Sequence, residues 1–195
     1  YNVIVGCTDM GTGCDTIIAQ FVADSLDTDI DNIAVFGVDT DTSPYDSGSY
    51  ASSTTYLTGM AAVKAAEQMR EKLLQLAAKI LEEDITKLEF DGKRVFCEET
   101  GKEVSLFDLA TASMVNNEIA LEVTYSHSSP VSPPPFMAAC AEVEVDPETG
   151  AIELLDYTAC VDCGTVVNTN LARVQTEGGL LQGIGMTLYE DVWYN

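Results

Sequence analysis

Basic residues are scarce in this sequence. Nine Lys and Arg stand against 32 Asp and Glu in 195 residues, so the formal net charge is −23. A surface this acidic repels nucleic-acid phosphates and anionic lipid headgroups, which argues against nucleic acid and membrane as partners. Any anionic ligand must therefore be held by local backbone amides and helix N-termini, because no general positive field attracts it.

Long apolar runs are missing as well. No stretch approaches the length of a membrane span, and the first residues do not have the basic and apolar regions of a leader. A hydrophobic share of 46% with 21% charged residues is ordinary for a folded protein. Tyr1 opens the chain without an initiator Met, directly before a strand pattern. We therefore expect a piece of a larger protein with flanking parts at both ends.

Complete metal and nucleophile motifs are also absent. The six cysteines are too sparse for a disulfide scaffold, so we expect reduced thiols in a cytoplasmic protein. Cys160 and Cys163 have the spacing of a metal knuckle, but the chain offers no second pair and only the distant His127. We expect no metal at these sulfurs and assign His127 to a loop. No nucleophile elbow or hydrolase triad signature is present.

Hydrophobic periodicity predicts a mixture of helices and strands. The expected helices are residues 15–25, 52–83, 106–114 and 171–189. The expected strands are residues 1–10, 33–38, 88–90, 94–96, 120–125, 138–145 and 151–161. The strands and helices alternate loosely with hairpins among them, which favours the α+β class, with mixed sheets and packed helices.

The first candidate site is the segment from Met10 to Thr16, between a predicted strand and a predicted helix. Gly11 and Gly13 permit a turn that exposes its amides, and the helix N-terminus adds a partial positive charge. No P-loop Lys follows, and the third glycine of a dinucleotide fingerprint is missing. A plain tight turn and an anion site explain these residues equally well.

The second candidate site is Tyr50 to Thr55, at the entry of the long predicted helix. Small hydroxylated residues at a helix start commonly cap its free amides, and on local grounds this interpretation is the stronger one. The alternative is that these amides and hydroxyls face an anion.

The third candidate site is the last predicted helix, which contains Gln175 and four glycines at 178, 179, 183 and 185. Glycine costs roughly 1 kcal/mol relative to alanine inside a helix, so four glycines forfeit about 4 kcal/mol. Close packing against another element would compensate for this cost, and so would the approach of a ligand.

Taken in order, these segments resemble one family. The three stretches are Thr8–Gly13, Pro44–Gly59 and Asp162–Gly185, and Phe136–Gly150 matches a strand that the family places before the last helix. The chain is similar over nearly its whole length to the large subunit of molybdenum hydroxylases. These include xanthine dehydrogenase, aldehyde oxidase and the bacterial N-heterocycle and nicotinate dehydrogenases. The resemblance implies part of a molybdopterin-binding domain, with subdomains at about residues 1–83 and 84–195.

The resemblance also implies which residues surround the cofactor, a molybdopterin cytosine dinucleotide with molybdenum. The implied cofactor-binding residues are Met10, Gly11, Thr12, Gly13, Ala51, Ser52, Ser53, Thr54, Thr55 and Gln175. Three positions depart from the family pattern. Thr12 stands where many members have Gln, Thr169 where Pro is usual, and Val174 where Gly often precedes Gln175. The first departure puts one side-chain contact in doubt.

The implied reaction is oxidation of a purine, an N-heterocycle or an aldehyde with water-derived oxygen. The family's glutamate base would lie beyond Asn195, so no catalytic residue is assigned, and we expect the isolated chain to be inactive. Iron–sulfur clusters and FAD on partner subunits or domains would accept the electrons. The alternative is a non-catalytic scaffold or binding domain that has the same fold and no cofactor.

Overall fold

A computed structural model describes residues 1–116 and 119–195. The contacts divide the chain into two compact units, residues 1–130 and 131–195. The division falls after Pro130, later than the expected boundary near residue 83. Each unit is described by itself.

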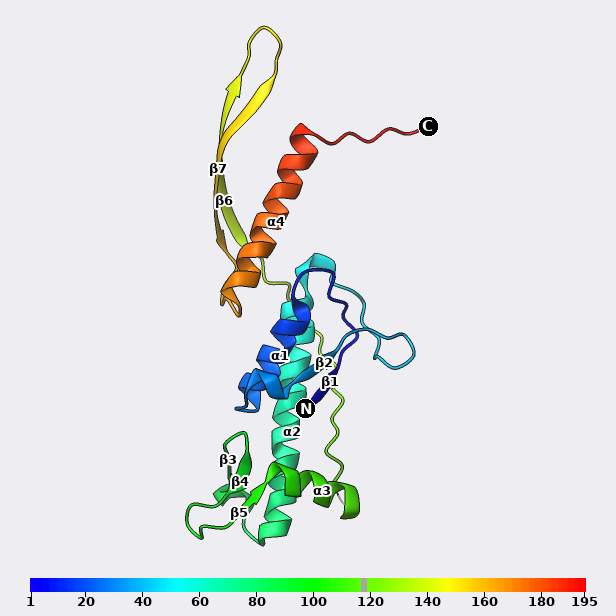
Figure 1. Cartoon of the computed structure of the whole chain (residues 1–195), viewed down its shortest axis with the longest axis vertical. Helices are drawn as coiled ribbons and strands as arrows, with labels where there is room; N and C mark the ends of the chain where they lie inside the picture. The colour runs from blue at the N-terminus through cyan, green and yellow to red at the C-terminus, as the bar shows by residue number, and fades with distance from the viewer. Residues whose placement is uncertain (117–118) are drawn as a thin grey trace. The chain divides into compact units, whose positions relative to one another are not determined.

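Unit 1 begins with a β-α-β crossover. Strand β1 (Asn2–Ile4) pairs in parallel with β2 (Ala34–Phe36), and helix α1 (Cys14–Ser25) connects them. Parallel strands need such a crossover, because a tight turn cannot join them. Helix α2 (Thr54–Leu81) lies alongside α1 (Figure 1).

The rest of unit 1 packs on the second half of α2. Strands β3 (Glu89–Phe90), β4 (Arg94–Phe96) and β5 (Glu103–Ser105) form an antiparallel sheet, and α3 (Leu106–Asn116) follows. One face of α2, with Leu73 and Leu76, is buried against these elements and α1. The buried hydrophobic cluster joins α1, α2 and the small sheet into one core.

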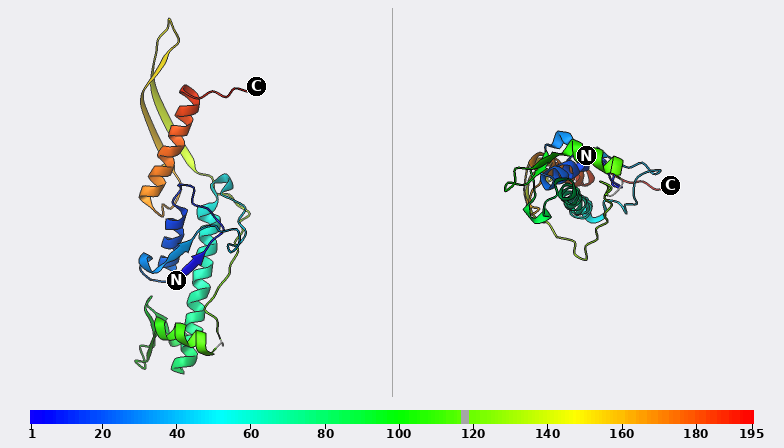
Figure 2. Two further views of the ribbon diagram at one scale, coloured as in Figure 1. Left: turned by 45° about the vertical axis from the view of Figure 1, so that its right-hand side comes forward. Right: turned by 90° about the horizontal axis from the view of Figure 1, so that it is seen from below.

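Unit 2 is a long hairpin with one helix. Strands β6 (Phe136–Val145) and β7 (Ile152–Asp162) pair antiparallel, and α4 (Thr169–Leu188) runs alongside them (Figures 1 and 2). The Asn168 side chain accepts a hydrogen bond from the amide of Leu171 at 3.1 Å and so caps α4. No described residue of this unit is buried.

The α+β class is confirmed, and most expected elements are present, but two strands were predicted wrongly. Residues 120–125 form no strand, because carbonyls of this segment bond to a side chain instead of to a neighbouring strand. Lys72 Nζ lies 3.2 Å from the carbonyl of Ala120 and 2.5 Å from that of Glu122. The first strand is also much shorter than residues 1–10, since β1 ends at Ile4. Among the described residues, no helix is both long and apolar enough to cross a membrane.

Candidate functional site

The two helices of the crossover region begin at the same end of unit 1. Helices α1 and α2 run in the same direction, and the turn before α1 lies beside the start of α2 (Figures 1 and 2). Their contact supports this alignment, since a Cβ atom placed on Gly59 would lie 2.6 Å from Cε2 of Phe21. Gly6 lies against the carbonyl of Pro44, which brings the loop before α2 to the end of β1. The structure thus brings the first two candidate segments together.

The turn before α1 already binds an anionic group, the side chain of Asp9. Its Oδ1 accepts hydrogen bonds from the amides of Gly11 at 2.9 Å and Gly13 at 3.1 Å. These glycines have φ values of 102° and 76°, which residues with a side chain rarely adopt. The bond from Gly11, with help from Gly13, holds the pKa of Asp9 below its ordinary value. Because Asp9 accepts both amide bonds, it holds the turn in its shape.

The start of α2 is a strained helix entry without a side-chain cap. Ala51 and Ser52 have positive φ values of 52° and 57°, an uncommon conformation for residues other than glycine. Ser53 occupies the N-cap position, yet its side chain makes no capping hydrogen bond. The Thr54 hydroxyl donates instead to Ser49 Oγ at 2.6 Å. The capping interpretation of these hydroxyls is therefore not what the structure shows for Ser53.

Gln175 belongs to unit 2, where it lies exposed on α4. A Cβ atom placed on Gly178, Gly179 or Gly183 would have no neighbour within 4 Å. Packing inside unit 2 therefore does not explain these three glycines. Because Gln175 and the other two segments lie in different units, their common site stays a prediction.

Sequence reasoning missed the group formed by Asp9, Cys14 and Asp15. Their ligand atoms lie within 4.8 Å of one another, and among the described residues this is the one group that could hold a metal ion. Burial raises the pKa of Cys14, and it raises that of Cys7 to about 12. A protonated thiol is a poor ligand, and Asp9 already accepts two amide bonds. An Asp two residues before a glycine often forms such a turn, and this signal could have identified the role of Asp9.

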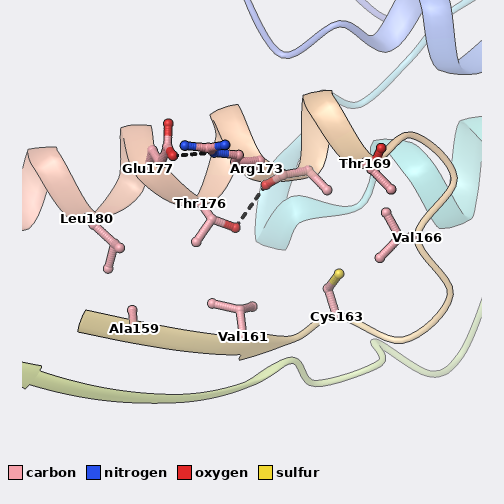
Figure 3. Close-up of a pocket in the computed structure, with 10 residues that line it drawn as sticks. Ala159, Val161, Cys163, Val166, Thr169, Arg173, Thr176, Glu177 and Leu180 are labelled. Atoms are coloured by element: carbon pink, nitrogen blue, oxygen red, sulfur yellow. Dashed lines mark hydrogen bonds and ion pairs between the residues drawn. The ribbon is translucent and has the colours of Figure 1, made fainter.

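Unit 2 contains an open cavity of about 370 Å³ between β7 and α4 (Figure 3). Val161, Val166 and Leu180 give it apolar walls. Arg173 forms an ion pair with Glu177 at 2.6 Å on the helix side. None of the expected cofactor-binding residues lines this cavity.

Comparisons with known proteins agree with one another. The family model described as "Molybdopterin cofactor-binding domain" matches residues 1–195. The chain is 33% identical over 199 residues to the "6-hydroxypseudooxynicotine dehydrogenase complex subunit gamma" of Paenarthrobacter nicotinovorans, covering 99% of this chain and 25% of that protein. It is 37% identical over 191 residues to the "Probable hypoxanthine oxidase XdhD" of Escherichia coli K12, covering 97% of this chain and 20% of that protein.

A solved structure also resembles the chain. The structure of a Cu,Mo-CO dehydrogenase in its carbon monoxide reduced state matches with a TM-score of 0.81 and 30% identity. The match covers 97% of this chain and 24% of that one. The chain thus spans a quarter or less of the length of these relatives.

Proposed function

The chain belongs to the molybdopterin cofactor-binding domain family, and from this premise we propose that it forms part of a molybdopterin dinucleotide site in a molybdenum hydroxylase. The observation that carries the proposal is the common end of α1 and α2, where an amide-rich turn lies beside an uncapped helix start. Helix N-termini suit phosphate groups, because their free amides and the helix dipole both favour negative charge.

The residues at this end fit an anionic cofactor at one helix better than at the other. The first turn of α2 offers amides to which Ser53 makes no side-chain bond, together with the hydroxyls of Ser52 and Thr55. The turn at Gly11 and Gly13 is also rich in amides, but Asp9 accepts two of them. We propose that the phosphates lie at α2, that the Met10–Gly13 turn forms a wall beside them, and that Gln175 contacts the cofactor by its side chain.

When bound, the molybdenum centre would supply the oxidation of a purine, N-heterocycle or aldehyde by a water-derived oxygen. The residues of this chain would bind and orient the cofactor. We place the general base and the substrate pocket in other parts of a longer polypeptide, and the iron–sulfur and FAD groups on partner domains or subunits. The relatives named as a dehydrogenase complex subunit and as a CO dehydrogenase large chain support such an assembly.

One observation favours a second candidate, a scaffold of the same fold without cofactor. The carboxylate of Asp9 occupies the amides that a phosphate would otherwise use. Full-length protein that folds normally and contains no molybdenum would favour this alternative.

The cofactor site can be tested at the exposed Thr55 in the first turn of α2. Thr55→Asp adds a negative charge at a helix N-terminus, which stabilises the helix by about 0.3–1 kcal/mol and repels an anionic cofactor. We expect at least about tenfold weaker cofactor retention in the full-length protein, the equivalent of 1.4 kcal/mol. Thr55→Asn is the matched control and should retain its molybdenum, measured by elemental analysis beside thermal unfolding. Full molybdenum loading of the Thr55→Asp variant would refute the site.

The role of Gln175 has its own control two turns along the same helix. Gln175→Ala should lower the molybdenum content of the full-length protein, whereas Gln182→Ala should not. The two substitutions are matched because both side chains are exposed on α4. Equal effects of the two substitutions would mean that α4 contributes only through its folding.

We expect the isolated chain of 195 residues to show no turnover and no stoichiometric molybdenum. A partial site lacks several charge-assisted hydrogen bonds, each worth about 1.5–3 kcal/mol, and the general base. Elemental analysis and a dye-reduction assay with purines, aldehydes and nicotinate measure both properties. Turnover by this chain alone would show that the missing contacts are not needed.

A further inference from the structure

The β6–β7 hairpin has one apolar face from its root to its tip. The pairing places Met137 opposite Val161, Ala139 opposite Ala159, Ala141 opposite Tyr157, Val143 opposite Leu154, and Val145 opposite Ile152. Side chains alternate between the two faces of a strand, so these pairs share one face. The other face carries acidic residues toward the tip, as in the pair of Glu144 and Glu153.

A β-bulge keeps the apolar residues near the tip of the hairpin on the same face as those near its root. Glu142 pairs with Asp156, and the next residue, Val143, pairs with Leu154, so Leu155 is the extra residue. The burial of β7 follows this change, because Leu154 and Tyr157 are both half-buried while Asp156 between them is exposed. Bulges redirect side chains in this way.

Helix α4 covers only the root half of this apolar face. The cavity between them is lined from β7 by Ala159 and Val161, and no residue nearer the tip contributes to it (Figure 3). In Figures 1 and 2 the hairpin tip extends beyond the end of α4. Val143, Val145 and Ile152 remain 49%, 52% and 54% exposed. We call Val143, Val145, Ile152 and Leu154 the tip strip.

The charges around the tip strip restrict its partner. Residues 142–156 contain no Lys or Arg, and their acidic residues are Glu142, Glu144, Asp146, Glu148, Glu153 and Asp156. A second copy of the chain, with its own net charge of −23, would be repelled at this surface. A segment with an apolar face and Lys or Arg at its borders would be attracted.

We propose that the tip strip is a docking surface for such a segment, provided by another part of the same longer polypeptide. The relatives support this source, since the stretch they share with this chain is only 20–26% of each of them. A two-stranded ribbon also needs a further packing element to be stable, and beyond α4 none of the described residues of unit 2 supplies one at the tip. The docked segment would cover the apolar face near the tip, as α4 covers it near the root.

Thiol labelling tests the proposal with internal controls on the opposite face. Val145→Cys and Ile152→Cys are made separately, and the exposed native Cys140 and Cys160 report on the acidic face. Maleimide labelling is followed site by site by mass spectrometry, in the 195-residue chain and in the full-length protein. We expect labelling at both new sites to be at least about tenfold slower in the full-length protein, with a smaller change at Cys140 and Cys160. Added salt should partly restore the rate, because it screens the bordering charges.

Three results would overturn the proposal. The first is an unchanged labelling rate at residues 145 and 152 in the full-length protein. The second is equal protection of Cys140 and Cys160, which would remove the preference for one face. The third is protection that depends on concentration in the chain alone, which would identify a second copy as the partner. Agreement between the two new positions guards against a local effect of either substitution.

Discussion

Units 1 and 2 use similar apolar patterns with opposite results. In unit 1 the apolar residues of α1, α2 and the small sheet meet in one buried cluster. In unit 2 the apolar residues of β6, β7 and α4 remain half-buried or exposed. An apolar pattern therefore marks a face that can be buried, and its burial depends on other elements, as α1 and the small sheet bury one face of α2 in unit 1.

The largest difference between the units should appear on removal of a large apolar side chain. Leu73 on α2 is 2% exposed. Leu73→Ala should lower the free energy of unfolding by about 2–5 kcal/mol, because a cavity remains in the core. Leu181 on α4 is 69% exposed, so Leu181→Ala should lower the free energy of unfolding by less than about 0.5 kcal/mol. Urea unfolding followed by circular dichroism compares them, and similar costs would remove the contrast between the units.

A smaller contrast is expected between two helix glycines. Gly59→Ala should destabilise unit 1 by about 1–3 kcal/mol, because the new methyl group would meet the Phe21 ring at 2.6 Å. Gly178→Ala in α4 has open space and should instead stabilise the helix by up to about 1 kcal/mol. Thermal unfolding of the 195-residue chain measures both, and a stabilised Gly59→Ala would mean that Phe21 moves aside easily.

Acidification should affect the two units differently. The pKa values of Asp9 and Asp146 are both lowered, the first mainly by the Gly11 amide and the second mainly by the Thr149 hydroxyl. Their contributions are therefore complete above the ordinary carboxyl pKa of about 3.9 and are lost as the pH falls through the lowered values.

We expect the loss at Asp9 to stay local, because the core still holds β1 and α1, and the loss at Asp146 to loosen the hairpin. The protection factors of the amides, which correct for the pH dependence of intrinsic exchange, should fall between pH 5 and 2 along β6 and β7. In unit 1 they should fall only at the Gly11–Gly13 turn. The variants Asp9→Asn and Asp146→Asn should remove the pH dependence at their own sites.

The smallest effect should come from surface ion pairs. Arg173 and Glu177 on α4 lie 2.6 Å apart but are 78% and 58% exposed, so Arg173→Ala should cost less than about 0.5 kcal/mol. Lys64→Ala, which breaks the Lys64–Glu67 pair on α2, is the matched change in unit 1. Both effects should vanish in high salt when helicity is followed by circular dichroism. A larger cost at Arg173 would indicate that its side chain has a packing role in unit 2.

Local patterns were sufficient to predict most elements. The long helix was expected at residues 52–83 and is Thr54–Leu81, because its apolar stripe repeats at helical spacing. The strand expected at 120–125 failed, since apolar alternation cannot show that the Lys72 side chain takes its carbonyls. The strand expected at residues 1–10 was too long, because its partner β2 ends at Phe36, which stands opposite Ile4.

The candidate site was only partly predictable. Glycines at 11 and 13 indicated an amide-rich turn, and the structure contains it. The occupation of its amides by Asp9 depends on geometry that spacing alone suggests but does not fix. The positive φ values of Ala51 and Ser52 had no sequence signal at all, because neither residue is a glycine.

The bulge at Leu155 makes residue parity an unreliable guide to this hairpin. Before it, the apolar face of β7 carries even residue numbers, and after it, odd ones, as Leu154 and Tyr157 show. The apolar residues alternate regularly within each half of β7. Over the whole strand the contributions of the two halves to an alternation score would cancel, because their apolar positions have opposite parity. Deleting Leu155 would restore a regular ladder. Each later residue would then move down by one number, and the apolar face of β7 would carry even numbers along its whole length. A sequence alignment that places a gap elsewhere in β7 would therefore assign the tip residues of a relative to the wrong face.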